Sequence, residues 1–140
     1  MGTFQSTVEI GDSQQQRFQG VELWVDTGAT YTWLPRDLLE SLGYMPTFRR
    51  QFLLADGTVI ERDLCWVPVR LNGEVQPTPC VFGDQGSEPL LGAMTLETFS
   101  LGVGPVNRKL IPVLANALMI RPFAQARRER RNVEQGELLS

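Results

Sequence analysis

Residues 21–30 of the chain read Val21-Glu22-Leu23-Trp24-Val25-Asp26-Thr27-Gly28-Ala29-Thr30. Apolar side chains recur at every second position up to Val25, which is the period of a strand with one buried face. The strand then meets a carboxylate, a hydroxyl and a glycine. An ionised carboxylate is costly to bury unless it is stabilised. A neighbouring hydroxyl can hold it, and a glycine lets the backbone turn and lets another chain approach. We therefore expect Asp26 to be held rigidly and to point into a cleft.

The composition is that of an ordinary globular protein. A length of 140 residues suits one domain with a sizeable core, and 42 % of the residues are hydrophobic while 21 % are charged. The net charge of -3 provides no general attraction to nucleic acid or to an anionic membrane. We therefore expect neither of these as a partner.

The sequence contains 0 histidines, which excludes several kinds of catalytic site. A Ser-His-Asp triad, a Cys-His pair and a His-ligated metal site are all impossible. Acid–base chemistry must come from carboxylates, Lys, Tyr or Cys. The 2 cysteines, Cys65 and Cys80, are too few for a metal knuckle or a disulfide scaffold, and we interpret them as core thiols. We expect no metal and no cofactor.

Nothing in the sequence predicts a membrane span or a secretory signal. The N-terminus lacks the basic and then apolar pattern of a signal peptide. The longest apolar run, residues 110–120, is interrupted by Pro112 and Asn116 and is too short to span a bilayer. Residues 1–6 fit the loose myristoylation pattern, but we interpret the match as coincidence or a cloning remnant. We expect a cytoplasmic protein without N-terminal acylation.

The rest of the chain predicts mostly short strands. We expect strands at residues 3–10, 17–26, 31–34, 64–71, 75–82 and 114–120, a hairpin over 101–113, and a short helix over 35–42 that is capped by Gly43. Asn72-Gly73 predicts a two-residue turn between two of these strands. From residue 121 the apolar periodicity ends and arginines dominate, so we expect residues 121–140 to be a charged, flexible tail.

Two further stretches are informative. Asp56-Gly57 lies between β-prone residues and predicts a hairpin with a type I′ turn, in which both central residues have positive φ. Leu90-Leu91-Gly92 leads into a short amphipathic helix in which Leu96 and Phe99 share a face.

Taken in order, three motifs give the chain a resemblance to a known family. Asp26-Thr27-Gly28-Ala29 resembles the active-site signature of retropepsin-like aspartic proteases, the hairpin at Asp56-Gly57 resembles their flap, and Leu90-Leu91-Gly92 resembles their second aliphatic-aliphatic-glycine element. The resemblance covers residues 3–113. It implies an all-β fold with one or two short helices, formed by a single lobe with a closed or folded β-barrel and a flap hairpin. We expect this domain to occupy residues 1–120.

The resemblance also implies an acid protease that works as a homodimer. Two carboxylates would flank one water, sharing a single proton, and would hydrolyse peptide bonds in extended, hydrophobic segments of a peptide or an unfolded protein. The signature occurs once in this chain, and Asp84-Gln85-Gly86 has glutamine where a hydroxyl is needed. The second carboxylate is therefore expected from an identical copy, at a two-fold axis.

The family pattern implies a role for each matching residue. Asp26 is the catalytic carboxylate, Thr27 bonds across the two-fold axis, Gly28 offers its carbonyl to substrate, and Ala29 lines the pocket. The flap residues that would close over the peptide are Leu54, Ala55, Asp56, Gly57 and Thr58. The residues that would support the active-site loop from behind are Leu90, Leu91 and Gly92. An apolar lining is expected from Leu53, Leu54, Val59 and Phe82, which would favour bulky hydrophobic side chains at the cut.

Two other interpretations stay open at this point. The chain could be a catalytically weak or inactive retropepsin-like module that dimerises or binds peptides. It could also be a carboxylate-based metal or sugar-processing enzyme, which would need a second acid about 5 to 9 Å from Asp26. Glu22, Asp37 and Asp56 are the candidates for that second acid.

Overall fold

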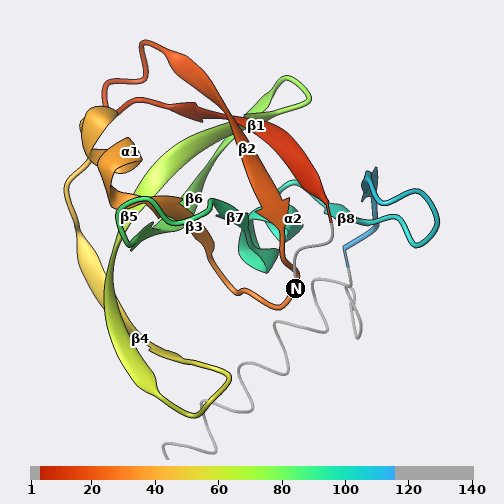
Figure 1. Ribbon diagram of the computed structural model, residues 1–140. Coiled ribbons are helices and arrows are strands. Elements are labelled where there is room, and N and C mark those ends of the chain that lie inside the picture. The colour runs from red at the N-terminus through yellow and green to blue at the C-terminus, as the bar shows by residue number, and fades with distance from the viewer. Residues whose placement is uncertain (1–3, 116–140) are drawn as a thin grey trace, which may run out of the picture.

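The structure is a computed structural model that describes residues 4–115. The elements in chain order are β1 (Gln5–Gly11), β2 (Phe18–Val25), β3 (Thr32–Pro35), α1 (Arg36–Ser41), β4 (Phe48–Leu53), β5 (Val59–Leu71), β6 (Glu74–Gly83), β7 (Leu90–Leu91), α2 (Ala93–Thr98), β8 (Leu101–Val103) and β9 (Leu110–Pro112). The predicted fold class, mostly β with two short helices, is confirmed (Figure 1).

Seven strands form one sheet that returns on itself. Their order is β1-β2-β7-β3-β6-β5-β4, and β1 also pairs with β5 through Glu9↔Arg70 and Ile10↔Val69. An ion pair between Arg70 and Glu9 supports this closing contact. The apolar side chains that alternate along the strands fill the interior; Ile10, Leu23 and Val67 are each 0 % exposed. This closed arrangement fixes the position of the loop that follows β2.

The hairpin between β5 and β6 has the turn that the sequence predicts. Asn72 and Gly73 both have positive φ, 51° and 80°, as a type I′ turn requires. The same two strands carry the cysteines, which face each other in the ladder as Cys65↔Cys80. Both are free and buried, which confirms that they are core thiols.

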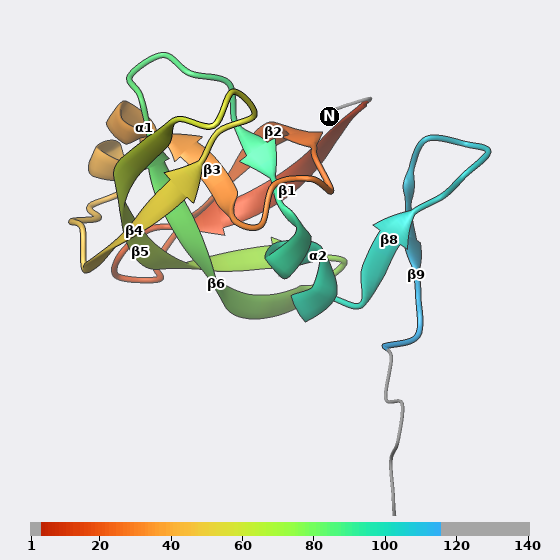
Figure 2. The same cartoon turned by 90° about the horizontal axis from the view of Figure 1, so that it is seen from below.

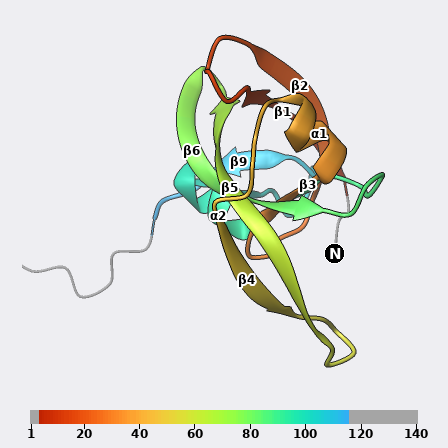
Figure 3. The same cartoon turned by 90° about the vertical axis from the view of Figure 1, so that its left-hand side faces the viewer.

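The hairpin between β4 and β5 projects from the body of the molecule (Figures 1 and 3). Its predicted type I′ turn is wrong, because only Gly57 has positive φ at the tip, 89°. The Leu54 N–H donates to the Thr58 carbonyl at 2.8 Å, and the Gly57 N–H donates to the Leu54 carbonyl at 3.0 Å. This is a three-residue loop that ends on a left-handed glycine. The Asp56 carboxylate accepts the Thr58 N–H at 2.9 Å and stabilises the loop.

Both predicted helices are present. Helix α1 begins directly after Pro35, the last residue of β3, and Gly43 follows the helix with φ of 89°. Helix α2 begins directly after Gly92 and buries Leu96 and the adjoining Phe99, as predicted. Neither helix within residues 4–115 has the length and the continuous hydrophobicity that crossing a bilayer requires.

The last described strands, β8 and β9, form the predicted hairpin, which stands apart from the seven-stranded sheet (Figure 2). The predicted strand over residues 114–120 and the predicted tail over residues 121–140 lie almost wholly outside the described residues. The division of the chain into a domain over residues 1–120 and a tail over residues 121–140 therefore stays a prediction.

Candidate active site

Asp26 follows the last residue of β2, and its main chain is fixed by the neighbouring strand. β7 runs parallel to β2, with Trp24 opposite Leu90 and Val25 opposite Leu91. The Asp26 N–H donates to the Leu91 carbonyl at 3.0 Å, and the Ala29 N–H donates to the Asp26 carbonyl at 3.2 Å. The two-residue strand β7 thus holds the start of the loop over residues 26–30.

Helix α2 holds the end of the same loop. The Ala93 N–H donates to the Ala29 carbonyl at 2.7 Å, and the Met94 N–H donates to the Thr30 carbonyl at 2.9 Å. Gly92 permits this contact, because a Cβ at that position would lie 2.2 Å from the Tyr31 carbonyl oxygen. Only a residue without a side chain lets the helix approach the loop so closely.

A buried pair of hydroxyls connects the same segments through their side chains. The Oγ1 atoms of Thr32 and Thr95 lie 2.6 Å apart, and the Gly92 N–H donates to the Thr32 Oγ1 at 3.1 Å. Both threonines are at most 1 % exposed. A buried polar pair of this kind is stable only while each partner is present. The pair of Thr32 and Thr95 therefore holds β3 against helix α2 directly behind the loop.

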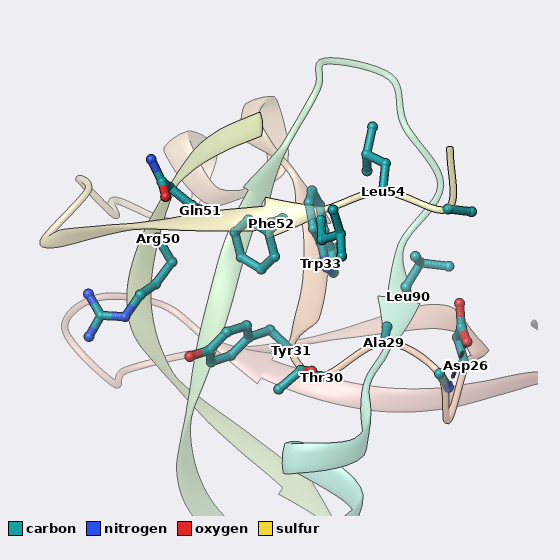
Figure 4. Close-up of a pocket in the computed structure, with 13 residues that line it drawn as sticks. Asp26, Ala29, Thr30, Tyr31, Trp33, Arg50, Gln51, Phe52, Leu54 and Leu90 are labelled. Carbon is teal, nitrogen blue, oxygen red and sulfur yellow. Dashed lines mark hydrogen bonds between the residues drawn. The ribbon is translucent and has the colours of Figure 1, made fainter. Parts of the chain in front are cut away.

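The loop forms one wall of a cleft of about 700 Å³ (Figure 4). The opposite wall comes from β4 and the tip of its hairpin. The residues that line the cleft are Asp26, Gly28, Ala29, Thr30, Tyr31, Trp33, Arg50, Gln51, Phe52, Leu53, Leu54, Ala55 and Leu90. The cleft therefore brings the acidic motif and the hairpin together from distant parts of the sequence.

Three aromatic rings form the middle of the cleft. The Phe52 ring meets the Tyr31 ring edge-on at 5.8 Å between centroids, and it lies 5.1 Å from the Trp33 ring. Such pairs are attractive beyond their buried area. They join the strand that follows the acidic motif to the strand that enters the hairpin, and they give the cleft an apolar surface.

The Asp26 carboxylate accepts a hydrogen bond from the Gly28 N–H at 3.0 Å. This bond aims the carboxylate, and a donor to a carboxylate favours its ionised form. Asp26 is the one carboxylate among the described residues that line the cleft. Residues 4–115 also contain no cluster of three or more acidic or thiol side chains able to hold a metal ion.

The candidate second acids lie elsewhere in the described chain. Glu22, Asp37 and Asp56 do not line the cleft, and Asp84 lies 3.5 Å from the Arg62 guanidinium, in the turn after β6. The arrangement within one chain therefore disfavours the metal or sugar-processing interpretation, which needs two acids on one cleft.

Of the predicted site residues, the cleft brings together Asp26, Gly28, Ala29, Leu54 and Ala55. Thr27 is exposed beside the cleft, and the three remaining flap residues lie at the exposed hairpin tip: Asp56, Gly57 and Thr58. Leu90 also lines the cleft, while Leu91 and Gly92 are buried behind it.

Two expectations about the apolar lining are wrong, although Leu53 and Leu54 do line the cleft. Phe82 is 1 % exposed in the core, because β6 turns it inward. Val59 lies on β5 opposite Leu53 in the ladder and is not among the residues that line the cleft. Both positions were expected from hydrophobicity alone, which does not distinguish a residue that lines the cleft from one that does not.

Sequence reasoning missed the aromatic rings and Arg50. Tyr31 and Trp33 are two positions apart at the start of a strand, and Arg50 and Phe52 have the same spacing in the next one. In a strand this spacing places each pair on one face. This spacing of two residues was therefore the sequence signal that could have placed these side chains together.

The comparisons with known proteins agree with this geometry. Of the solved structures, 220 chains match the fold. One is the EIAV protease in complex with the inhibitor HBY-793, with 20 % identity over 69 % of this chain and 86 % of that chain and a TM-score of 0.52. Another is the solution structure of the Simian Foamy Virus (mac) protease, with 17 % identity, coverage of 69 % and 94 %, and a TM-score of 0.49. The match to the EIAV protease shows that the fold is that of a single retroviral protease domain.

The sequence itself places the chain in a family. Residues 6–95 match the model of the family described as aspartyl protease. This match spans more than half of the chain and contains the acidic motif, the hairpin and Leu90-Leu91-Gly92. The chain belongs to the aspartyl protease family and is retropepsin-like. No protein with a curated description matches the sequence at a significant level.

Proposed function

We propose that the chain is an aspartic endopeptidase whose active site is assembled from two identical copies. The observation that carries this proposal is the cleft in which Asp26 is the single lining carboxylate among residues 4–115. The Gly28 N–H holds this carboxylate, and β7 and α2 hold its loop. Half of the required pair of acids is thus supplied by one chain. A two-fold axis beside the loop would supply the other half.

The two Asp26 carboxylates would divide the chemistry between them. Two carboxylates about 3 Å apart do not ionise together at low cost, so the pair shares one proton. The ionised member takes a proton from water, whose oxygen attacks the carbonyl carbon, while the protonated member donates to the carbonyl oxygen. Transfer of a proton to the amide nitrogen then lets the C–N bond break. No covalent intermediate with the enzyme forms.

The walls of the cleft suit an extended, apolar peptide. Gly28 has no side chain, so its carbonyl can accept a hydrogen bond from a substrate backbone, and Ala29 leaves room beside it. The aromatic rings of Tyr31, Trp33 and Phe52 offer apolar contact. The hairpin tip with Leu54 and Ala55 would close over the bound peptide. Bulky hydrophobic side chains at the cut are therefore favoured.

Thr27 would connect the two halves of the site. It is exposed directly beside Asp26, where its hydroxyl can bond to the matching loop of the partner copy. A buried inter-chain hydrogen bond of this type contributes about 1 kcal/mol. Thr27→Ala should weaken the dimer more than it weakens the fold of one chain. Sedimentation that gave an unchanged dimer dissociation constant would contradict this role.

The decisive experiment is a cleavage assay with an unfolded protein or a hydrophobic peptide library below about pH 6, across a range of enzyme concentrations. Activity per chain should rise with concentration, and Asp26→Asn should abolish it while the dimer persists. Equal cleavage by this variant would refute the role of Asp26. A folded dimer that binds peptides without cleaving them would favour the alternative of an inactive binding module.

A further inference from the structure

The cleft ends on a positive charge at the side away from Asp26. Figure 4 shows Arg50 at one end of the cleft and Asp26 at the other, with Phe52 and Trp33 between them. Arg50 is the one cationic side chain among the described residues that line the cleft. The chemistry of the cleft therefore changes along its length, from a carboxylate through aromatic rings to a guanidinium.

The Arg50 guanidinium is held in place without a carboxylate partner among residues 4–115. Its Nη1 donates to the Arg49 carbonyl at 2.8 Å, and its Cζ lies over the Phe48 ring, 4.9 Å from the centroid. These contacts use one of its five N–H groups and the face of the guanidinium. The remaining N–H groups match a carboxylate, which guanidinium binds with two parallel hydrogen bonds.

The adjacent arginine provides a contrast on the same strand. Arg49 lies one position earlier and faces the other side of β4, where it pairs with Asp63 at 2.9 Å and with Glu61 at 3.3 Å. It does not line the cleft. Of two neighbouring arginines, one is therefore neutralised within the fold, and the other faces the cleft with its charge uncompensated within the described chain.

We propose that Arg50 determines specificity by binding an acidic side chain of the substrate, three or four residues from the bond that is cut. This inference rests on the proposed function. Arg50 precedes Leu54, which lines the cleft at the end near Asp26 (Figure 4), by four positions, about 13 Å along a strand. A substrate in extended conformation has the same rise per residue. Its carboxylate therefore reaches the guanidinium when its scissile bond lies at Asp26.

The symmetry of the proposed dimer gives a second consequence. Each half of the two-fold site carries one Arg50, so both ends of the bound peptide meet a guanidinium. Acidic residues on either side of the cut should each accelerate cleavage, and a peptide with both should be the preferred substrate. The substrate class is therefore an apolar segment that is flanked by Asp or Glu.

The test is a peptide series with one apolar centre, in which a single Glu is moved from the second to the sixth position on either side of the cut and compared with Gln. Wild type should show a maximum in kcat/KM at the third or fourth position, about three- to tenfold above the Gln peptide. The preference should shrink as ionic strength rises from about 0.05 to about 0.5 M. An equal rate for all positions would overturn the inference while leaving the proposed function intact.

Variants separate this role from a general effect of charge. Arg50→Gln should abolish the Glu preference, so that kcat/KM becomes equal for the Glu and the Gln peptide, and Arg50→Glu should turn the preference toward Lys. Arg49→Gln removes the same charge from the opposite face of β4 and should retain the Glu preference. Loss of the preference in Arg49→Gln, or its survival in Arg50→Gln, would refute the assignment.

Binding gives a readout that does not need turnover. Asp26→Asn, titrated with fluorescent Glu and Gln peptides, should bind the Glu peptide more tightly by the same factor, and the additional substitution Arg50→Gln should remove the difference. If wild type cleaves no peptide, the proposed function fails, yet this titration still decides whether Arg50 binds a carboxylate. Equal affinities for both peptides would overturn the inference.

Discussion

Replacement of Gly92 by alanine should disrupt the active-site loop from behind. A Cβ at this position would lie 2.2 Å from the Tyr31 carbonyl oxygen, 2.4 Å from its carbon and 2.9 Å from the Thr32 nitrogen. All three are backbone atoms, so no side-chain rotation relieves the clash. Relief requires a shift of about 1 Å between the loop and α2, since ordinary contacts begin near 3.4 Å and part of the overlap can be shared. Such a shift would strain the bond from Gly92 N–H to Thr32 Oγ1, which is 3.1 Å long.

The expected magnitude follows from these two effects. Overpacking costs about 1–3 kcal/mol, and a weakened buried hydrogen bond adds about 1 kcal/mol. The free energy of unfolding should therefore fall by about 3 kcal/mol, measured by urea denaturation. Any cleavage activity should fall by more than the unfolded fraction explains, because the loop that carries Asp26 is held by α2 and shifts when α2 shifts.

Gly20→Ala is the matched control for this substitution. A Cβ at Gly20 would meet only a Thr7 methyl carbon, at 3.8 Å, which is ordinary contact. Replacing a strand glycine by alanine without strain is neutral or stabilising by up to about 1 kcal/mol. If Gly92→Ala were as stable as Gly20→Ala, the close approach of α2 would not constrain the loop, and the reasoning would be refuted.

Three further predictions concern stability and reactivity. Thr32→Val and Thr95→Val should each lower the free energy of unfolding by about 1–3 kcal/mol through an unpaired buried hydroxyl, and the double variant should lose less than the sum in a double-mutant cycle. A hydrogen bond from Arg36 holds the pKa of Asp63 below its ordinary value. The ionised carboxylate therefore stabilises the fold above its unfolded pKa, roughly 3.9, and this contribution is lost as pH falls through the folded pKa. In urea titrations at acid pH, Asp63→Asn should reduce the dependence of the free energy of unfolding on pH. Burial raises the pKa of Cys65 to about 12, so alkylation of native protein near pH 8 should be far slower than in denaturant, and equal rates would show that the thiol is accessible.

The sequence predicted the local parts of the fold well, because each is determined by neighbouring residues. The hairpin at Asn72-Gly73 needs two residues of positive φ, and that dipeptide supplies both. The short helix α2 follows from Gly92 and from the spacing of Leu96 and Phe99. The turn at Asp56-Gly57 was predicted as a hairpin but with the wrong geometry, because the Asp56 carboxylate caps a longer loop.

The non-local parts could not be predicted in the same way. β7 is only two residues long, yet it inserts between β2 and β3 and fixes Asp26 through the Leu91 carbonyl. No propensity or periodicity indicates such an insertion in Leu90-Leu91. The bond between Thr32 and Thr95 joins positions 63 residues apart, and either threonine alone looks like an ordinary β-branched residue.

Hydrophobicity alone does not locate the residues that line the cleft. Phe82 is as apolar as Leu53, but Phe82 is 1 % exposed in the core, whereas Leu53 is 75 % exposed and lines the cleft. Arg49 and Arg50 are chemically identical, and one position along β4 separates an internal ion pair from a cleft-facing charge. A register shift of one residue in β4 would exchange the two arginines and remove Phe52 from the aromatic rings. The pairing of β4 with β5, from Phe48↔Leu64 to Leu53↔Val59, therefore determines which charge a substrate meets.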